Sequence, residues 1–163
     1  MGYWAAVVPA ERYSEERLVG ADVVAVSDLP AVPGDWVVLV APLDPPVVFG
    51  LGLVTGKGRV RYIRRLFDEP LAGDGIEAGP LTEEAFRALA AKAGPAAPVR
   101  TWLVGVDLPI EADTRAEAVR RYWSYLRDLG PAELPAYVAP VGDELAMQAY
   151  LLGMEAPLDP EED

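Results

Sequence analysis

The chain of 163 residues contains no cysteine and no histidine. Their absence excludes disulfides, thiolate nucleophiles, imidazole acid–base catalysis and the usual kinds of zinc site. Asparagine is also missing, glutamine occurs once, and lysine occurs twice against twelve arginines. Few thermolabile side chains together with 16 prolines favour a thermophilic, GC-rich source. A GC-rich genome without heat adaptation gives the same composition and stays open as the alternative.

Long hydrophobic runs are absent as well. No run approaches the roughly 18 to 20 apolar residues that span a bilayer. The N-terminal stretch MGYWAAVVPAER has no basic segment ahead of a long apolar core. We therefore expect a soluble, cytoplasmic protein without a membrane partner. The chain length suits one ordinary domain, or a small domain plus an extension, and 52% hydrophobic residues argue against disorder.

Positive charge is scarce but concentrated. The net charge is −12, which argues against general affinity for nucleic acid, because phosphate binding depends on cations. The stretch GKGRVRYIRR (56–65) nevertheless holds five basic residues, and the rest of the chain sums to −17. These residues are Lys57, Arg59, Arg61, Arg64 and Arg65. Any anionic partner must meet this local patch.

The first 67 residues read as short strands and tight turns. Apolar runs predict strands in GYWAAVVPA, ADVVAVSDL, PGDWVVLVAP, VVFGLGLVTG and RVRYIRRLF. Ser14 is expected to cap a short helix that ends at Gly20. Strands at such close spacing are typical of a small barrel or a strongly bent sheet.

Helical patterns appear later in the chain. Thr82 precedes a predicted helix in EEAFRALAAKAG, and RTWLVGVDLPI predicts a strand. Thr114 and Glu117 form a capping box that opens a helix ending at Leu129. Residues 143–152 predict a further helix, with a hairpin strand as the competing interpretation. The acidic tail after Gly153 predicts a mobile end.

Familiar catalytic patterns are missing. The glycines of FGLGLVTGKG match neither dinucleotide-binding nor phosphate-loop spacing, and no serine lies in a nucleophile elbow. Asp107, Glu111 and Asp113 are close in sequence, but no further metal ligand is evident, so solvated carboxylates are the simpler interpretation. We predict no catalytic residue, no metal site and no cofactor, and an enzyme ranks third among the functions considered.

The stretch RYWSYL resembles an aromatic box. At helical spacing Tyr122 belongs to the apolar stripe of the predicted helix, while Trp123 and Tyr125 could cover another element or a second copy. Core packing or a dimer contact is favoured over a ligand cage. A homodimer through the helix at 114–129 is therefore one candidate function.

The basic stretch has two interpretations. In an extended strand Arg59 and Arg61 project to one face, where two guanidinium groups could bind phosphate or carboxylate. Tyr62 and Phe67 could stack on a base. Alternatively the arginines pair with the protein's own acids, such as Asp68. The sequence leaves both open.

The order of these elements resembles the PUA-like superfamily, particularly its EVE and ASCH branches. The similarity covers roughly residues 1–112 and is carried by Tyr3-Trp4, the turn Pro33-Gly34-Asp35, and the pattern of Phe49, Gly50 and Gly52. It implies a small pseudo-barrel that binds RNA or modified nucleobases in a cleft lined by aromatic side chains. Trp4 or Trp36 could line such a cleft. The charge of −12 departs from the pattern, and residues 113–163 have no counterpart in it.

These observations predict an α+β protein with two parts: a PUA-like β-barrel with peripheral helices at 1–112, and a helix-containing extension at 113–163 packed on it. The leading function is non-catalytic binding of RNA, single-stranded nucleic acid or a nucleotide-like ligand. The alternative is a homodimeric protein-interaction module. The predicted ligand-binding residues are Lys57, Arg59, Arg61, Arg64, Arg65, Trp4, Trp36 and Tyr62.

Overall fold

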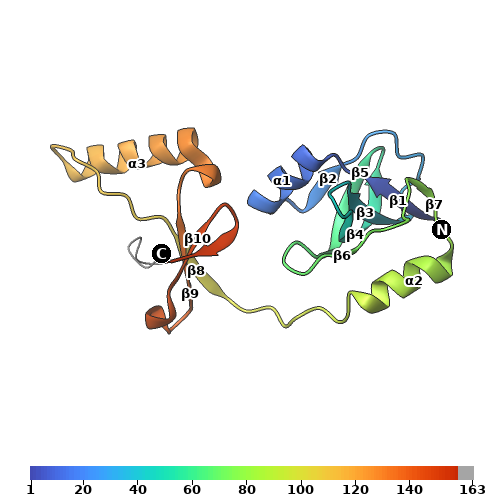
Figure 1. Ribbon diagram of the computed structural model, residues 1–163. Helices are drawn as coiled ribbons and strands as arrows, with labels where there is room; N and C mark the ends of the chain where they lie inside the picture. The colour runs from blue at the N-terminus through green and yellow to red at the C-terminus, as the bar shows by residue number, and fades with distance from the viewer. Residues whose placement is uncertain (158–163) are drawn as a thin grey trace. The chain divides into compact units, whose positions relative to one another are not determined.

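The computed structural model describes residues 1–157, and the chain divides into two compact units, residues 1–97 and 98–163 (Figure 1). The predicted mixed α+β class is confirmed, with strands gathered into two sheets. The division falls before residue 98, whereas the sequence placed it after residue 112. The difference arises because strand β8 (Trp102–Gly105) pairs with strand β9 (Ala136–Pro140) of the second unit.

The first unit is built on one mixed sheet. Its strands follow the order β2-β5-β4-β3-β1-β7, and β6 pairs with β4. Within residues 1–97, all of which the structure describes, β1 and β3 are the only parallel pair. The path does not return from β7 to β2, so the described strands do not close the barrel that the sequence suggested. The strands are β1 (Tyr3–Val7), β2 (Val23–Ala25), β3 (Trp36–Ala41), β4 (Val47–Gly56), β5 (Arg59–Arg65), β6 (Leu71–Ala72) and β7 (Gly79–Pro80).

The sheet is buried on both faces at its centre. Along β3, Val37 and Leu39 pack into one apolar cluster, while Val38 and Val40 pack into the other. Such continuous burial explains why β3 reads as an unbroken apolar run rather than an alternating one. Helix α1 (Ala10–Leu18) contributes Tyr13 to the first cluster, and helix α2 (Glu83–Lys92) contributes Phe86 to the second.

The helix starts show one confirmed prediction and one wrong one. Helix α2 begins directly after Thr82, whose Oγ1 accepts a hydrogen bond from the Ala85 N–H at 3.1 Å, as predicted. Helix α1 begins at Ala10 and not after Ser14. Pro9 fixes an extended backbone just before the helix, and the alanine and glutamates that follow are helix formers. Ser14 instead lies inside the helix and donates to the Ala10 carbonyl at 3.0 Å.

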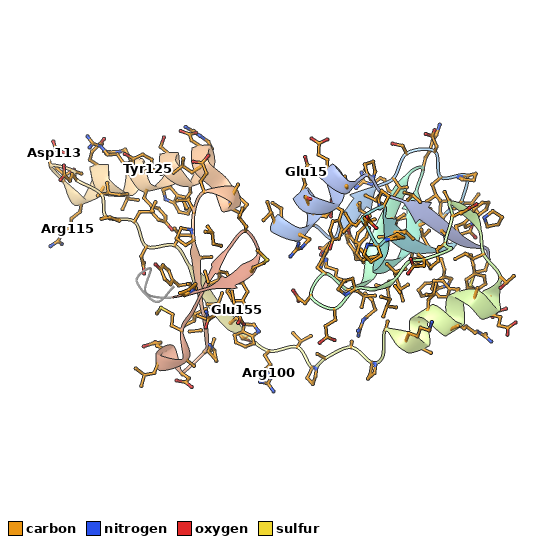
Figure 2. All side chains as sticks on the ribbon, in the orientation of Figure 1. Glu15, Arg100, Asp113, Arg115, Tyr125 and Glu155 are labelled. Atoms are coloured by element: carbon orange, nitrogen blue, oxygen red, sulfur yellow. The ribbon has the colours of Figure 1, made fainter. Side chains whose placement is uncertain are left out.

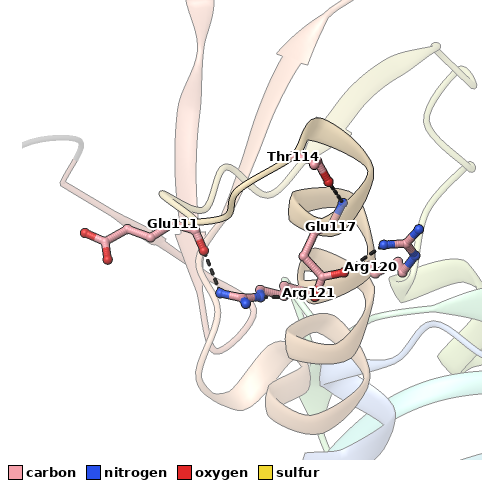
Figure 3. Close-up of polar contacts among 5 residues, drawn as sticks. All are labelled: Glu111, Thr114, Glu117, Arg120 and Arg121. Carbon is pink, nitrogen blue, oxygen red and sulfur yellow. Dashed lines mark hydrogen bonds and ion pairs between the residues drawn. The ribbon is translucent and has the colours of Figure 1, made fainter.

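The second unit has a small antiparallel sheet in the order β11-β10-β9-β8 and one long helix, α3 (Arg115–Leu129). Thr114 caps α3, because its Oγ1 accepts from the Glu117 N–H at 3.1 Å (Figure 3). Figure 2 shows Asp113 and Arg115 at the end where α3 begins and Tyr125 further along it. The remaining elements are the 3-10 turns η1 (Gly130–Ala132) and η2 (Glu144–Ala146), and strands β10 (Gln148–Leu151) and β11 (Met154–Ala156).

The helix predicted at residues 143–152 is wrong, and the competing hairpin is confirmed. Strands β10 and β11 are joined by Leu152 and Gly153, with φ of 55° and 74°. Two successive positive φ values define the hairpin turn whose twist matches antiparallel strands. Asp143 makes no side-chain capping bond, so nothing starts a longer helix there. The predicted mobile tail falls largely on residues 158–163, which lie outside the described residues. No helix within residues 1–157 could cross a membrane.

Candidate nucleic-acid interface

The β4–β5 hairpin carries the basic stretch. Its turn contains Lys57 between two glycines, and Gly58 has a φ of 62°. A side chain at Gly58 would meet the Val26 carbonyl oxygen at 2.7 Å, so the turn requires glycine for close approach as well as for its backbone angle. The Gly58 carbonyl accepts a hydrogen bond from the Val26 N–H at 2.8 Å. The tip of the hairpin is therefore fixed against the residue that follows β2.

Arg64 and Arg65 have partners within the first unit. Arg64 Nη2 donates to the carbonyl of Ala93, at the C-terminal end of α2, at 3.0 Å. Arg65 Nη2 donates to the Ala21 carbonyl and lies 3.2 Å from Asp22 Oδ1. Arg65 thus pairs with one of the protein's own acids, which is Asp22 and not Asp68, whereas Arg64 bonds to a backbone carbonyl and to no acid within residues 1–157.

Lys57, Arg59 and Arg61 differ from that pair. All three are exposed, and none makes an ion pair or a side-chain hydrogen bond within residues 1–157. Val60, between the two arginines, is fully buried, so Arg59 and Arg61 share the opposite face of the sheet, as expected from strand alternation. A chain with 26 acidic residues thus leaves three neighbouring cations unneutralised on one hairpin.

Trp36 lies on the same sheet face as Arg61. It pairs across the sheet with Leu53, and Leu53 in turn pairs with Arg61, which places the two side chains two strands apart, about 10 Å. The Trp36 ring lies 5.5 Å from the ring of Phe86 on α2. It is half-buried and is part of the packing under that helix.

Tyr62 is held within the fold. Its hydroxyl donates to Glu16 Oε2 at 3.2 Å, and Glu16 is buried and paired with Arg12 at 2.7 Å. The Arg65 guanidinium lies 5.0 Å from the centre of the Tyr62 ring. Burial, reinforced by the Glu16 carboxylate, raises the pKa of the Tyr62 phenol, which stays neutral at physiological pH. These contacts join α1 to β5.

Trp4 is oriented by a buried carboxylate. Its indole Nε1 donates to Asp35 Oδ2 at 3.0 Å. The same carboxylate accepts from the backbone N–H of Gly2 at 2.5 Å and of Val32 at 3.0 Å. The bond from Gly2, then that from Val32, hold the pKa of the Asp35 carboxyl below its ordinary value. Asp35 belongs to the predicted turn before β3, and the position of its side chain sets that of the Trp4 ring.

A pocket of about 330 Å³ opens beside Trp4. Its walls are residues 4–7 of β1, the loop 26–30 and residues 78–80. The lining is largely apolar, with Ser27 and Asp28 as its polar side chains. Asp28 has a φ of 56°, and its exposed carboxylate has no partner among the described residues. Because the pocket loop starts at Val26, it adjoins the hairpin turn that carries Lys57.

The structure therefore sorts the predicted residues into groups. Lys57, Arg59 and Arg61 lie together on the β4–β5 hairpin, and none of them lines the pocket beside Trp4. The link between the two is Val26, which lines the pocket and bonds to Gly58 in the hairpin turn. Tyr62, Arg64 and Arg65 have internal partners, and Trp36 packs under α2. Sequence reasoning missed Ser27 and Asp28. The turn-forming stretch Ser27-Asp28-Leu29-Pro30 after a short strand was the available signal, but it did not indicate a pocket.

The second unit contains no acidic metal site in its described part. Asp107, Glu111 and Asp113 do not gather, and no group of three potential ligands forms within residues 1–157. On α3, hydrogen bonds from Arg120 and Arg121 hold the pKa of Glu117 below its ordinary value (Figure 3). Tyr122 and Trp123 touch edge to face, with ring centres 5.4 Å apart. Trp123 is 63% exposed.

No protein-family model, curated protein or solved structure matches this chain.

Proposed function

We propose that the first unit binds single-stranded RNA, or a ligand resembling a nucleotide, without catalysing a reaction. The observation that carries this proposal is the exposure of Lys57, Arg59 and Arg61 without acidic partners, on a hairpin whose turn adjoins the loop of the Trp4 pocket. Neighbouring cations repel one another, and in so acidic a protein carboxylates were available to neutralise them. A phosphate group would supply the missing negative charge.

In this proposal a bound strand contacts both the hairpin and the pocket. The phosphate would lie on the hairpin, held by Lys57 as a point charge and by the forked donors of Arg59. The base would enter the pocket and contact the Trp4 ring, and stacking of this kind contributes about 1–3 kcal/mol per base. The pocket volume is near the lower end of the roughly 300–1,000 Å³ typical of small-molecule sites. Ser27 and Asp28 supply polar groups for the edge of a base.

The resemblance to the PUA-like superfamily supports the same proposal. The first strand with Trp4, the turn at Gly34-Asp35 and the two strands that follow are present as elements β1, β3 and β4. Membership of that superfamily implies a cleft for a base lined by an aromatic side chain, and Trp4 is our candidate. The overall charge of −12 implies that binding depends on the local cations and weakens steeply with salt.

Fluorescence anisotropy with labelled RNA and single-stranded DNA oligonucleotides, across a salt series, tests the proposal. The double variant Arg59→Ala/Arg61→Ala is expected to lower the log–log salt slope by roughly 1.4, about 0.7 for each phosphate group that the variant no longer neutralises. The control Arg87→Ala/Arg127→Ala makes the same change of charge at two residues, 75% and 78% exposed, on α2 and α3. Absence of binding at low salt, or an equal loss in the control, would refute the proposal.

A second candidate function is self-association through the second unit. It rests on the exposure of apolar side chains on α3, with Val119 at 56% and Trp123 at 63%. The two lie four residues apart and therefore on one side of the helix. Sedimentation of the wild type and of Trp123→Ala over a range of concentrations tests this contact. A dimer that the substitution leaves intact would exclude this part of α3 from the interface.

A further inference from the structure

Strand β8 is an apolar edge strand that lies open to solvent. All four of its residues are exposed, including Trp102 at 50%, Leu103 at 48% and Val104 at 66%. On one side β8 pairs with β9, and no strand within residues 1–157 pairs with its other side. Exposed hydrophobic edges are sites where another strand adds, and proteins usually protect them with charge, proline or a covering element.

The backbone groups that are free to pair can be identified from the register. The Val141 N–H donates to the Thr101 carbonyl at 3.4 Å, and β8 and β9 then pair in step from Trp102 opposite Pro140. In an antiparallel ladder the hydrogen-bonded residues alternate. Residues 101, 103 and 105 therefore direct their backbone groups toward β9. Trp102 and Val104 direct theirs away from it, at the open edge.

The two edges of this sheet differ in charge. Strand β11, at the opposite edge, contains Glu155, and four acidic residues follow in the sequence of 159–163. Two copies brought together there would repel. In residues 98–106, PVRTWLVGV, the single charged side chain is that of Arg100. In a chain of net charge −12, the β8 edge is thus one place where two copies can meet without opposing carboxylates.

The second unit also buries little apolar surface by itself. Its buried apolar residues within the described part are Leu134, Ala139 and Ala149, and α3 has none. A partner that extends the sheet and covers its edge would therefore stabilise this four-stranded sheet, which has so small a core of its own. An identical edge is suited to this, since antiparallel pairing about a two-fold axis presents the same surface from both copies.

We propose that the chain forms a two-fold dimer in which β8 pairs antiparallel with β8 of a second copy, making one eight-stranded sheet. The register follows from the free backbone groups. Trp102 of one copy pairs with Val104 of the other, and the reverse, which forms four hydrogen bonds. Leu103 then faces its own counterpart at the axis as a non-hydrogen-bonded pair. The proposal rests on the second candidate function, self-association of the second unit, but places the contact at β8 and not at α3. It is independent of RNA binding.

Cysteine cross-linking tests the register directly, because the natural chain has no cysteine. In Leu103→Cys of the full chain, the two Cα atoms would lie about 4.5 Å apart, within the range of about 4.4–6.8 Å that a disulfide spans. Mild oxidation is expected to convert most of this variant to a covalent dimer. Met154→Cys, on β11 and 56% exposed, is the matched control and is expected to remain monomeric on a denaturing gel. Trp123→Cys tests the alternative contact through α3.

Two substitutions at one position give an independent test without a cysteine. Val104→Pro removes the outward N–H while leaving the β9 ladder intact, whereas Val104→Thr keeps both the N–H and the branched side chain. Light scattering is expected to give twice the monomer mass for wild type and Val104→Thr, and the monomer mass for a folded Val104→Pro. A monomeric wild type would overturn the proposal, as would cross-linking at Trp123→Cys and not at Leu103→Cys. A monomeric wild type would also exclude self-association as a function. Cross-linking at Trp123→Cys alone would keep self-association but place the contact on α3.

Discussion

The indole nitrogen of Trp4 lies 3.0 Å from Oδ2 of Asp35, and this hydrogen bond ties the first strand to the turn that enters β3. The same carboxylate also accepts from the backbone of Gly2 and Val32. One buried acid thus satisfies three donors and orients the aromatic wall of the pocket. The proposed ligand site therefore depends on a side chain that itself lies outside the pocket.

Asp35→Asn should destabilise the first unit. The amide has one oxygen where the carboxylate has two, so at least one of the three donors loses its acceptor. The midpoint of thermal unfolding should fall clearly. Asp28→Asn is the matched control, because Asp28 is exposed and has no partner among the described residues. Asparagine also tolerates the positive φ of this position as well as aspartate does. Equal midpoints for the two variants would contradict the role assigned to Asp35.

The contribution of Asp35 should depend on pH. Its pKa in the folded state is lowered relative to the unfolded state, chiefly by the bond from the Gly2 N–H. The stabilisation is therefore present above the unfolded value, about 3.9 for an aspartate, and is lost as the pH falls through the folded value. Urea unfolding at a series of pH values should show wild type and Asp35→Asn converging in strong acid. A difference that stays constant down to that range would be inconsistent with this assignment.

Gly52→Ala should destabilise the protein, whereas Gly20→Ala should not. A Cβ at Gly52 would meet Val60 Cγ1 at 2.3 Å and the Arg61 carbonyl oxygen at 2.8 Å, so β5 would have to move. Crowding of this kind typically costs about 1–3 kcal/mol. Nothing lies within 4 Å of a Cβ at Gly20. Denaturant unfolding of the two variants provides the comparison, and a Gly52→Ala protein as stable as wild type would show that the strands are packed less closely.

Arg61→Ala should affect RNA binding, whereas Arg64→Ala should affect stability. Arg64 donates to the Ala93 carbonyl at the end of α2, so its loss should lower the unfolding free energy by roughly 1 kcal/mol and affect RNA binding little. Arg61 has no partner within residues 1–157, so its loss should leave stability unchanged and weaken RNA binding. Unfolding curves and anisotropy titrations on the same two proteins measure both properties. Matching effects on both properties would refute this division of the basic stretch.

Much of the local structure could be predicted from the sequence, because it depends on neighbours along the chain. Strands β3 and β4 are apolar on both faces, and Thr82 and Thr114 cap helices through residues three positions away. The partners of Arg64 and Arg65 could not be predicted in this way. Ala93 and Asp22 are 29 and 43 residues distant in sequence, and only the folded sheet brings them close.

The alternation of residues in the sequence also did not predict an irregularity in β5. Leu51 pairs with Arg64 and the next residue, Gly52, pairs with Tyr62, so Ile63 is an extra residue opposite that step. A bulge of this kind reverses the alternation beyond it. It places Arg64 on the same face as Arg61, where α2 lies, and simple alternation would place the two on opposite faces. The sequence likewise grouped strand β8 with the first unit, whereas it pairs with β9 of the second, whose residues are more than 30 positions later in the chain.

A two-dimensional NMR titration of the full chain with a short single-stranded RNA at low salt would show whether the hairpin and the Trp4 pocket bind the same ligand. We expect the indole N–H signal of Trp4 and the backbone signals of residues 57–61 and 27–28 to shift together and to saturate at one affinity. Signals of Trp102 and Trp123, in the second unit, should not shift with them. Shifts confined to the second unit, or none at all, would contradict the claim that the hairpin cations and the Trp4 pocket form a nucleotide-binding site.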